Sequence, residues 1–157
     1  MDLILWRHAE AQDWLEGEAQ AGSDLDRALT PRGEKQAVRM AGWLDRHLPE
    51  GVRILVSPAR RCEQTVMALG RKYKLRTELA PDATPEQLLE LVAWPTSKLP
   101  TLVVGHQPIL GQTIARLLGL QESECPVKKG AVWWLRNRDR EGFRQTVVVT
   151  VQSPETL

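Results

Sequence analysis

Short apolar runs are spaced along the chain in a way that predicts buried strands. Residues 3–6, 53–56 and 101–104 are mostly apolar and have the length of strands that are buried on both faces of a sheet. The first run breaks abruptly into charge at Arg7. We therefore expect residues 3–6 to form a central strand.

Apolar residues spaced three or four positions apart predict helices between these strands. Their spacing indicates helices over roughly 31–48, from Pro58 to about Leu69, over a short stretch near 85–92, and after Pro108. Three of these helices begin with a residue that can cap the first turn followed by a proline, at Thr30-Pro31, Ser57-Pro58 and Thr84-Pro85.

The remaining segments predict the edges of the sheet. Residues 77–80 suggest a short strand, and 94–100 read as a loop. Residues 131–135 and 143–151 are rich in β-branched and aromatic side chains, and the charged stretch 137–142 predicts a turn between them. Together the pattern predicts one α/β domain over 1–157, with three layers, a mainly parallel central sheet, helices on both faces and an antiparallel edge hairpin.

Composition and charge exclude several classes of partner. The chain has 157 residues, 42% of them hydrophobic, and its 21 basic and 20 acidic residues give a net charge of +1. This balance argues against a nucleic-acid or membrane partner. The sequence has no glycine-rich phosphate loop, so a nucleotide cofactor is not expected. Cys62 and Cys125 have neither metal-ligand nor redox-pair spacing, so we expect buried, reduced thiols. No apolar run is long enough for a signal peptide or a membrane span, so we expect a cytoplasmic protein. We also expect it to be a monomer.

Polar residues follow three of the predicted strands. Arg7-His8 ends the first, residues 57–61 follow the second, and Gly105-His106 ends a later one. Because parallel strands end side by side, two arginines and two histidines can line one pocket beyond the sheet. Arginine binds phosphate oxygens through a planar fork, and a neutral imidazole can attack phosphorus to form phosphohistidine. A metal site on His8, Glu10 and His106 is disfavoured, because the arginines would repel a cation.

Several motifs resemble those of the histidine phosphatase superfamily, which includes phosphoglycerate mutases and many phosphatases. Residues 5–10, Leu-Trp-Arg-His-Ala-Glu, are similar to its Arg-His-Gly motif, and residues 57–65 to its Ser-Pro-x-x-Arg-x-x-Gln-Thr motif. Residues 29–37 resemble its Leu-Thr-x-x-Gly-x-x-Gln-Ala helix start, and Gly105-His106 resembles the motif of its second histidine. The short length and residues 27–30 look most like bacterial phosphohistidine phosphatases of the SixA type.

This resemblance implies a phosphoglycerate mutase-like fold and a role for five residues. His8 would be the nucleophile, Arg7 and Arg61 would bind the phosphoryl group, and His106 would help to stabilise the transition state. Arg27, just before Leu-Thr, would be a fourth phosphate ligand. No cofactor and no metal are implied.

Two departures from the family pattern bear on the substrate. Ala9 replaces the usual glycine, which adds one methyl group near the phosphate. Mutase-like members carry a catalytic glutamate in a segment that here reads Leu-Ala-Pro-Asp-Ala-Thr-Pro-Glu, leaving Asp82 and Glu10 as possible proton donors and no clear general acid. Imidazole is a better leaving group than an alkoxide, so the missing acid favours a phosphohistidine substrate.

The sequence leaves three hypotheses open. The first is hydrolysis of phosphohistidine on a protein, such as a phosphorelay or histidine-kinase domain, because about 50 residues between Arg61 and the end of the His106 motif leave little chain for a lid. The second is the same chemistry on a small phosphate ester or sugar phosphate. The third is an inactive phosphoprotein-binding module that keeps the pocket.

Overall fold

One mixed sheet runs through the computed structural model, which describes residues 1–13 and 23–157. In the described residues it has six strands in the order β3-β2-β4-β1-β5-β6. The strands are β1 (Asp2–Arg7), β2 (Arg53–Val56), β3 (Lys74–Leu75), β4 (Thr101–Gly105), β5 (Val132–Arg140) and β6 (Phe143–Gln152). β1, β2, β3 and β4 pair in parallel, whereas β5 pairs antiparallel with both β1 and β6.

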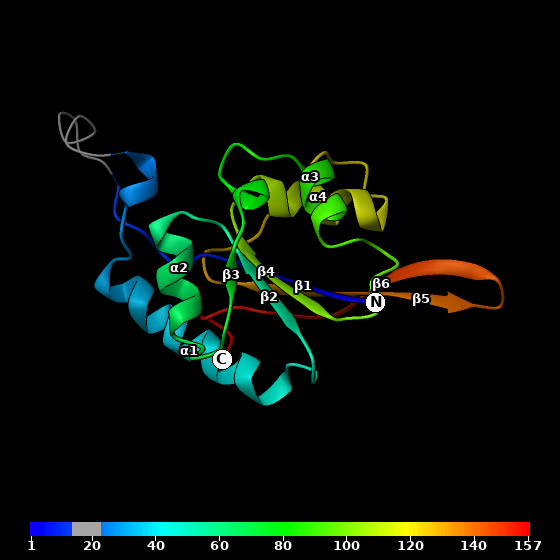
Figure 1. The fold of residues 1–157 in the computed structure, drawn as a ribbon, viewed down its shortest axis with the longest axis horizontal. Helices are drawn as coiled ribbons and strands as arrows, with labels where there is room; N and C mark the ends of the chain where they lie inside the picture. The colour runs from blue at the N-terminus through cyan, green and yellow to red at the C-terminus, as the bar shows by residue number, and fades with distance from the viewer. Residues whose placement is uncertain (14–22) are drawn as a thin grey trace.

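Helices cover both faces of this sheet (Figure 1). On one side lie α1 (Pro31–His47) and α2 (Arg60–Met67), and on the other lie α3 (Pro85–Leu91) and α4 (Ile109–Leu118). Among the described residues, the short 3-10 helices η2 (Asp24–Asp26) and η3 (Thr77–Leu79) lie in the connections. No helix within the described ranges is both long and apolar enough to span a membrane.

Strand residues point alternately to the two helical layers, as a buried sheet requires. In β1, Ile4 and Trp6 pack with the residues of α1 and α2, whereas Leu3 and Leu5 pack with those of α3 and α4. All four are fully buried. The fold class predicted from the sequence is thus confirmed, including the central position of residues 3–6 and the parallel sheet.

Three local predictions were wrong. The helix expected from Pro58 begins at Arg60, with Ala59 as its N-cap. The Ser57 hydroxyl accepts from the Ala59 N–H at 3.2 Å, one residue before the helix, and also binds His106. Residues 77–79 form η3 rather than a strand, and the edge strand is instead β3 at Lys74–Leu75.

The hairpin turn is also shorter than expected. β5 and β6 continue through the charged stretch, and the turn is Glu141-Gly142, both with positive φ. The tip of this hairpin projects away from the helical layers (Figure 1), so its strand residues are exposed to solvent. Their polar side chains therefore gave the same sequence pattern as a longer turn.

Candidate active site

A cavity of about 220 Å³ opens at the carboxyl ends of the parallel strands. It is lined by ten residues from the strand ends and their neighbours: Arg7, His8, Ala11, Asp13, Arg27, Arg61, Pro81, His106, Gln107 and Lys129. A larger hollow of about 620 Å³ lies against β2 and β3, but its lining contains no histidine, cysteine or carboxylate. The smaller cavity, lined by two histidines and three arginines, has the groups that nucleophilic chemistry on an anion requires.

His8 follows β1 and lies in this cavity with its ring oriented by the backbone. Its Nδ1 is 2.7 Å from the carbonyl oxygen of Ala9. A carbonyl oxygen only accepts hydrogen bonds, so Nδ1 carries the proton and Nε2 carries the lone pair. Burial, followed by the charges of Arg61, Arg7 and Arg27, lowers the pKa of His8 to about 3. The imidazole is therefore neutral and nucleophilic at physiological pH.

His106 follows β4, and its ring centroid lies 5.3 Å from that of His8. The Ser57 hydroxyl is 2.7 Å from its Nε2, and Nη2 of Arg61 is 3.4 Å from its Nδ1. Because a guanidinium only donates, Nδ1 accepts, and Nε2–H donates to Ser57. Burial, together with the neighbouring His8 and Arg61, lowers the pKa of His106 to about 3.

Three arginines border the cavity, and each is anchored to the backbone in the same way. Nη1 of Arg7 donates to the carbonyl of Val127 at 2.7 Å. Nη1 of Arg27 and Nη1 of Arg61 donate to other backbone carbonyls, each at 2.9 Å. Within the described residues, the buried Nε atoms of Arg7 and Arg61 have no hydrogen-bond partner. These unsatisfied donors fit an anion with several oxygen acceptors.

The loop after β1 is tied to α1 and α2 by side chains from the sequence motifs. The Ala9 N–H donates to the Thr65 hydroxyl at 3.0 Å, and that hydroxyl donates to the Arg61 carbonyl at 2.7 Å. The Glu10 N–H donates to Oε1 of Gln36 at 3.0 Å. The motif thus fixes the position of His8 relative to Arg61.

Residues 3–84 match the profile of the histidine phosphatase superfamily, branch 1. The chain belongs to the histidine phosphatase superfamily. It is 33% identical over 125 residues to phosphohistidine phosphatase SixA of Escherichia coli, a match that covers 74% of each chain. It is also 31% identical over 134 residues to a SixA homologue of Haemophilus influenzae, covering 76% of this chain and 78% of the relative.

The likeness to this histidine phosphatase branch extends to three dimensions. A structure of the protein histidine phosphatase SixA complexed with tungstate matches with a TM-score of 0.79 and 26% identity. The match covers 98% of this chain and 97% of that one. The resemblance to SixA-type members inferred from the sequence motifs is thereby confirmed.

The structure brings together five of the site residues expected from the sequence. His8, Arg7, Arg61, His106 and Arg27 all line the cavity. The two candidate proton donors lie outside its lining. Glu10 accepts a hydrogen bond from the Thr30 hydroxyl at 2.7 Å, and Asp82 is exposed in the turn before α3. Residues 1–13 and 23–157 contain no group of three or more His, Cys, Asp or Glu arranged to hold a metal ion.

Alanine at position 9 fits this histidine phosphatase site without backbone strain. Ala9 is fully buried against Ala11, Leu29 and Ala37. Positive φ among the described non-glycine residues is confined to Ala93 and Glu141, so position 9 does not need glycine's conformational freedom.

Sequence reasoning missed several contributors to the site. Ser57 was expected as a helix cap and among the polar residues after β2, but its contact with His106 was not predicted. Gln107 and Lys129 line the cavity, and Asp24 binds two of its arginines. Gln107 directly follows the second histidine, which is a usable signal, whereas Asp24 and Lys129 carry no pattern that marks them.

Proposed function

We propose that this protein is a metal-independent phosphatase that hydrolyses protein phosphohistidine through a covalent phosphohistidine intermediate on His8. The observation that carries the proposal is the fixed tautomer of His8 beside the arginines. Its Nδ1–H is held by the Ala9 carbonyl, and the ring borders the same cavity as Arg7 and Arg61. A neutral nucleophile next to unsatisfied guanidinium donors is suited to phosphoryl transfer.

In the first step, Nε2 of His8 attacks phosphorus and the P–N bond to the substrate imidazole breaks. The electron pair of that bond stays on the leaving ring nitrogen. When the other nitrogen of the substrate ring is protonated, the group leaves as neutral imidazole and needs no further proton. Arg7 and Arg61 donate to the phosphoryl oxygens and stabilise the charge there.

In the second step, water attacks the phosphorus of phospho-His8 and the new P–N bond breaks. One proton of the water goes to the released phosphate or to solvent, and His8 regains its lone pair on Nε2. The arginines donate to the phosphoryl group in both steps, and His106 stabilises it indirectly, because its Nδ1 accepts from Nη2 of Arg61. Phosphate charge is balanced by guanidinium groups throughout, so the reaction needs no metal ion.

The carboxylates around the cavity favour a phosphohistidine substrate over a phosphate ester. An alkoxide leaving group needs a proton donor, but neither Glu10 nor Asp82 lines the cavity. Asp13 does line it, with a side chain that is 92% exposed and 3.7 Å from Nη1 of Arg27. This carboxylate is paired with the Arg27 guanidinium and faces solvent, so it is not placed as a buried proton donor.

The partner is then a protein that bears phosphohistidine, such as a phosphorelay or histidine-kinase domain. The relatives from Escherichia coli and Haemophilus influenzae are both named as phosphohistidine phosphatases or their homologues, which supports this assignment.

The direct test is phosphate release from a histidine-phosphorylated phosphorelay domain. The same assay is run on p-nitrophenyl phosphate and on a panel of sugar phosphates, each with and without EDTA. We expect rapid turnover of phosphohistidine, slow turnover of the sugar phosphates and no effect of EDTA. His8→Ala should abolish turnover and the acid-labile phosphoenzyme that rapid quenching traps from the wild type.

His47→Ala is the matched control. The His47 ring stacks on that of Trp43, with 4.4 Å between the ring centroids, and does not line the cavity. It should keep wild-type rates. Faster turnover of sugar phosphates would instead identify an ester phosphatase, with Glu10 or Asp82 as the acid. Binding of phosphate without any release would identify a binding module, and activity in His8→Ala would exclude the covalent mechanism.

A further inference from the structure

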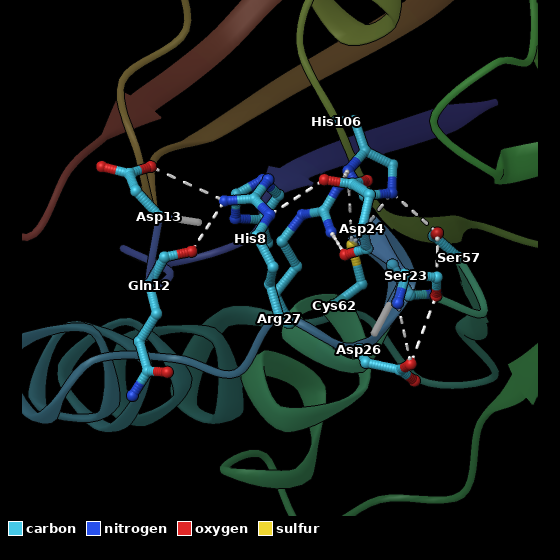
Figure 2. Close-up of polar contacts among 12 residues, drawn as sticks. His8, Gln12, Asp13, Ser23, Asp24, Asp26, Arg27, Ser57, Cys62 and His106 are labelled. Carbon is cyan, nitrogen blue, oxygen red and sulfur yellow. Dashed lines mark hydrogen bonds and ion pairs between the residues drawn. The ribbon is translucent and has the colours of Figure 1, made fainter. Parts of the chain in front are cut away.

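Asp24 connects two of the cavity's arginines. Its Oδ1 accepts from Nε of Arg27 at 2.9 Å, and its Oδ2 accepts from Nη2 of Arg61 at 3.0 Å. Its backbone carbonyl also accepts from Nη1 of Arg61 at 2.9 Å. Figure 2 shows Asp24 beside Arg27 and next to His106, so the contact is made at the reactive end of the site.

The edge of Arg61 that Asp24 uses decides what this contact does. A guanidinium has one fork formed by Nη1 and Nη2 and another formed by Nε and Nη2. Asp24 occupies the first fork, through its carbonyl and its carboxylate. Nε of Arg61, in the second fork, is buried without a partner among the described residues. Asp24 thus holds Arg61 from one side. Because Nη2 also lies 3.4 Å from Nδ1 of His106, Nε is the donor of the second fork that is left for a phosphoryl group.

Charge strengthens the same contact. Burial alone would raise the pKa of Asp24, but the hydrogen bonds and charges of Arg27 and Arg61 hold it below the usual value. The carboxylate is therefore ionised at physiological pH and separates two like charges. The Asp24 side chain is 52% exposed whereas that of Arg61 is only 4% exposed, so the carboxylate reaches the buried arginine from the solvent side.

We propose that Asp24 is a positioning residue, which holds Arg27 and Arg61 in the orientation that binds the transferred phosphoryl group. This inference rests on the proposed function, because it concerns the same anion site. It differs from a competing role, in which the carboxylate would occupy the place of the phosphoryl group and weaken its binding.

Phosphate binding and steady-state kinetics of Asp24→Asn test the inference. Isothermal titration with inorganic phosphate gives Kd, and p-nitrophenyl phosphate gives KM and kcat. We expect Kd and KM each to rise about tenfold or more, which is the effect of losing charge-assisted hydrogen bonds, with a smaller change in kcat. Asp24→Glu, which keeps the charge, should recover part of the loss.

Asp26→Asn is the matched control from the same 3-10 helix, η2. The Asp26 carboxylate binds only to the N–H and hydroxyl of Ser23, each at 3.3 Å, within the described residues. This variant should leave Kd unchanged while both variants shift the thermal unfolding temperature slightly. Equal losses of binding in the two variants would assign the effect to the fold of η2 and overturn the inference.

Two further outcomes would also overturn it while leaving the proposed function intact. Unchanged phosphate binding in Asp24→Asn would show that the contact has no positioning role. Tighter binding would show that Asp24 competes with phosphate. If the wild type neither bound phosphate nor hydrolysed any substrate, the proposed function itself would fail and this inference with it.

Discussion

The hydroxyl of Ser57 lies 2.7 Å from Nε2 of His106, although the two residues are 49 positions apart in the chain. They meet because β2 and β4 pair in parallel and end at the same edge of the sheet. Since Nδ1 of His106 faces Nη2 of Arg61, the hydroxyl fixes both the tautomer and the orientation of the ring. Ser57 therefore acts on the phosphoryl site through His106.

Removing this hydroxyl should impair catalysis more than folding. In Ser57→Ala, Nε2–H of His106 loses its oxygen acceptor and keeps only the weak sulfur acceptor of Cys62, 3.5 Å away. We therefore expect kcat/KM to fall about tenfold, corresponding to roughly 1.4 kcal/mol. Thr113→Ala is the control, because the buried Thr113 hydroxyl donates only to the Ile109 carbonyl in α4, among described contacts. It should lower stability and leave kcat/KM unchanged. Similar rates in the two variants would show that Ser57 is not needed to orient His106.

Lysine should not replace Arg61. All three nitrogens of this guanidinium have a place in the site: Nη1 and Nη2 bind Asp24, and Nε is the buried donor left for an anion. Lysine has one compact charge and cannot form both forks, so Arg61→Lys should lower kcat/KM about 100-fold or more. Arg60→Lys, at the neighbouring exposed position, should have wild-type kinetics. Equal kinetics in the two variants would remove Arg61 from the mechanism.

The sequence predicted the nucleophilic core of the site because that core follows strand ends. Arg7 ends β1, and His8 and His106 come directly after β1 and β4. Parallel pairing brings such positions together whatever the details of the helices. Arg27 was predicted as a phosphate ligand only from the family resemblance. Local patterns could not find it, because it reaches the cavity from the connection between β1 and α1.

Long-range contacts account for what sequence reasoning missed. Ser57-Pro58 is a good local helix start, but the Ser57 hydroxyl accepts from both the Ala59 N–H and His106, and the helix begins two residues after Pro58. In the sequence, Asp24 is one acidic residue in a polar stretch. Only the fold places it against Arg61, which is 37 positions away in the chain. Neither partner can be inferred from the spacing of residues near it.

Acid should destabilise the protein through its two active-site histidines. Both pKa values are lowered from 6.5 to about 3, so between these limits the unfolded chain binds protons that the folded chain does not. Stability is full above pH 6.5 and falls as the pH drops, by up to about 1.4 kcal/mol per pH unit for each histidine. Urea unfolding in phosphate-free buffers at pH 7, 6, 5 and 4.5 measures this slope.

The double variant His8→Asn/His106→Asn provides the comparison for that titration. It lacks both groups, so its unfolding free energy should depend much less on pH over the same range. An identical slope in the wild type and the double variant would mean that the two imidazoles are not buried in the neutral form.

Alanine substitutions at two glycines of α1 distinguish the effect of helix propensity from that of the packing that positions His8. A Cβ at Gly33 would lie 2.0 Å from the carbonyl oxygen of Glu10, whereas a Cβ at Gly42 has only Nη1 of Arg46 nearby, at 3.8 Å. Gly42→Ala should therefore stabilise the protein by up to about 1 kcal/mol in urea unfolding. Gly33→Ala must push the loop after β1 away from α1, so it should destabilise by about 1–3 kcal/mol and also lower phosphatase activity. If both alanines stabilised equally, the close packing of Glu10 on α1 would not be what holds the His8 loop in place.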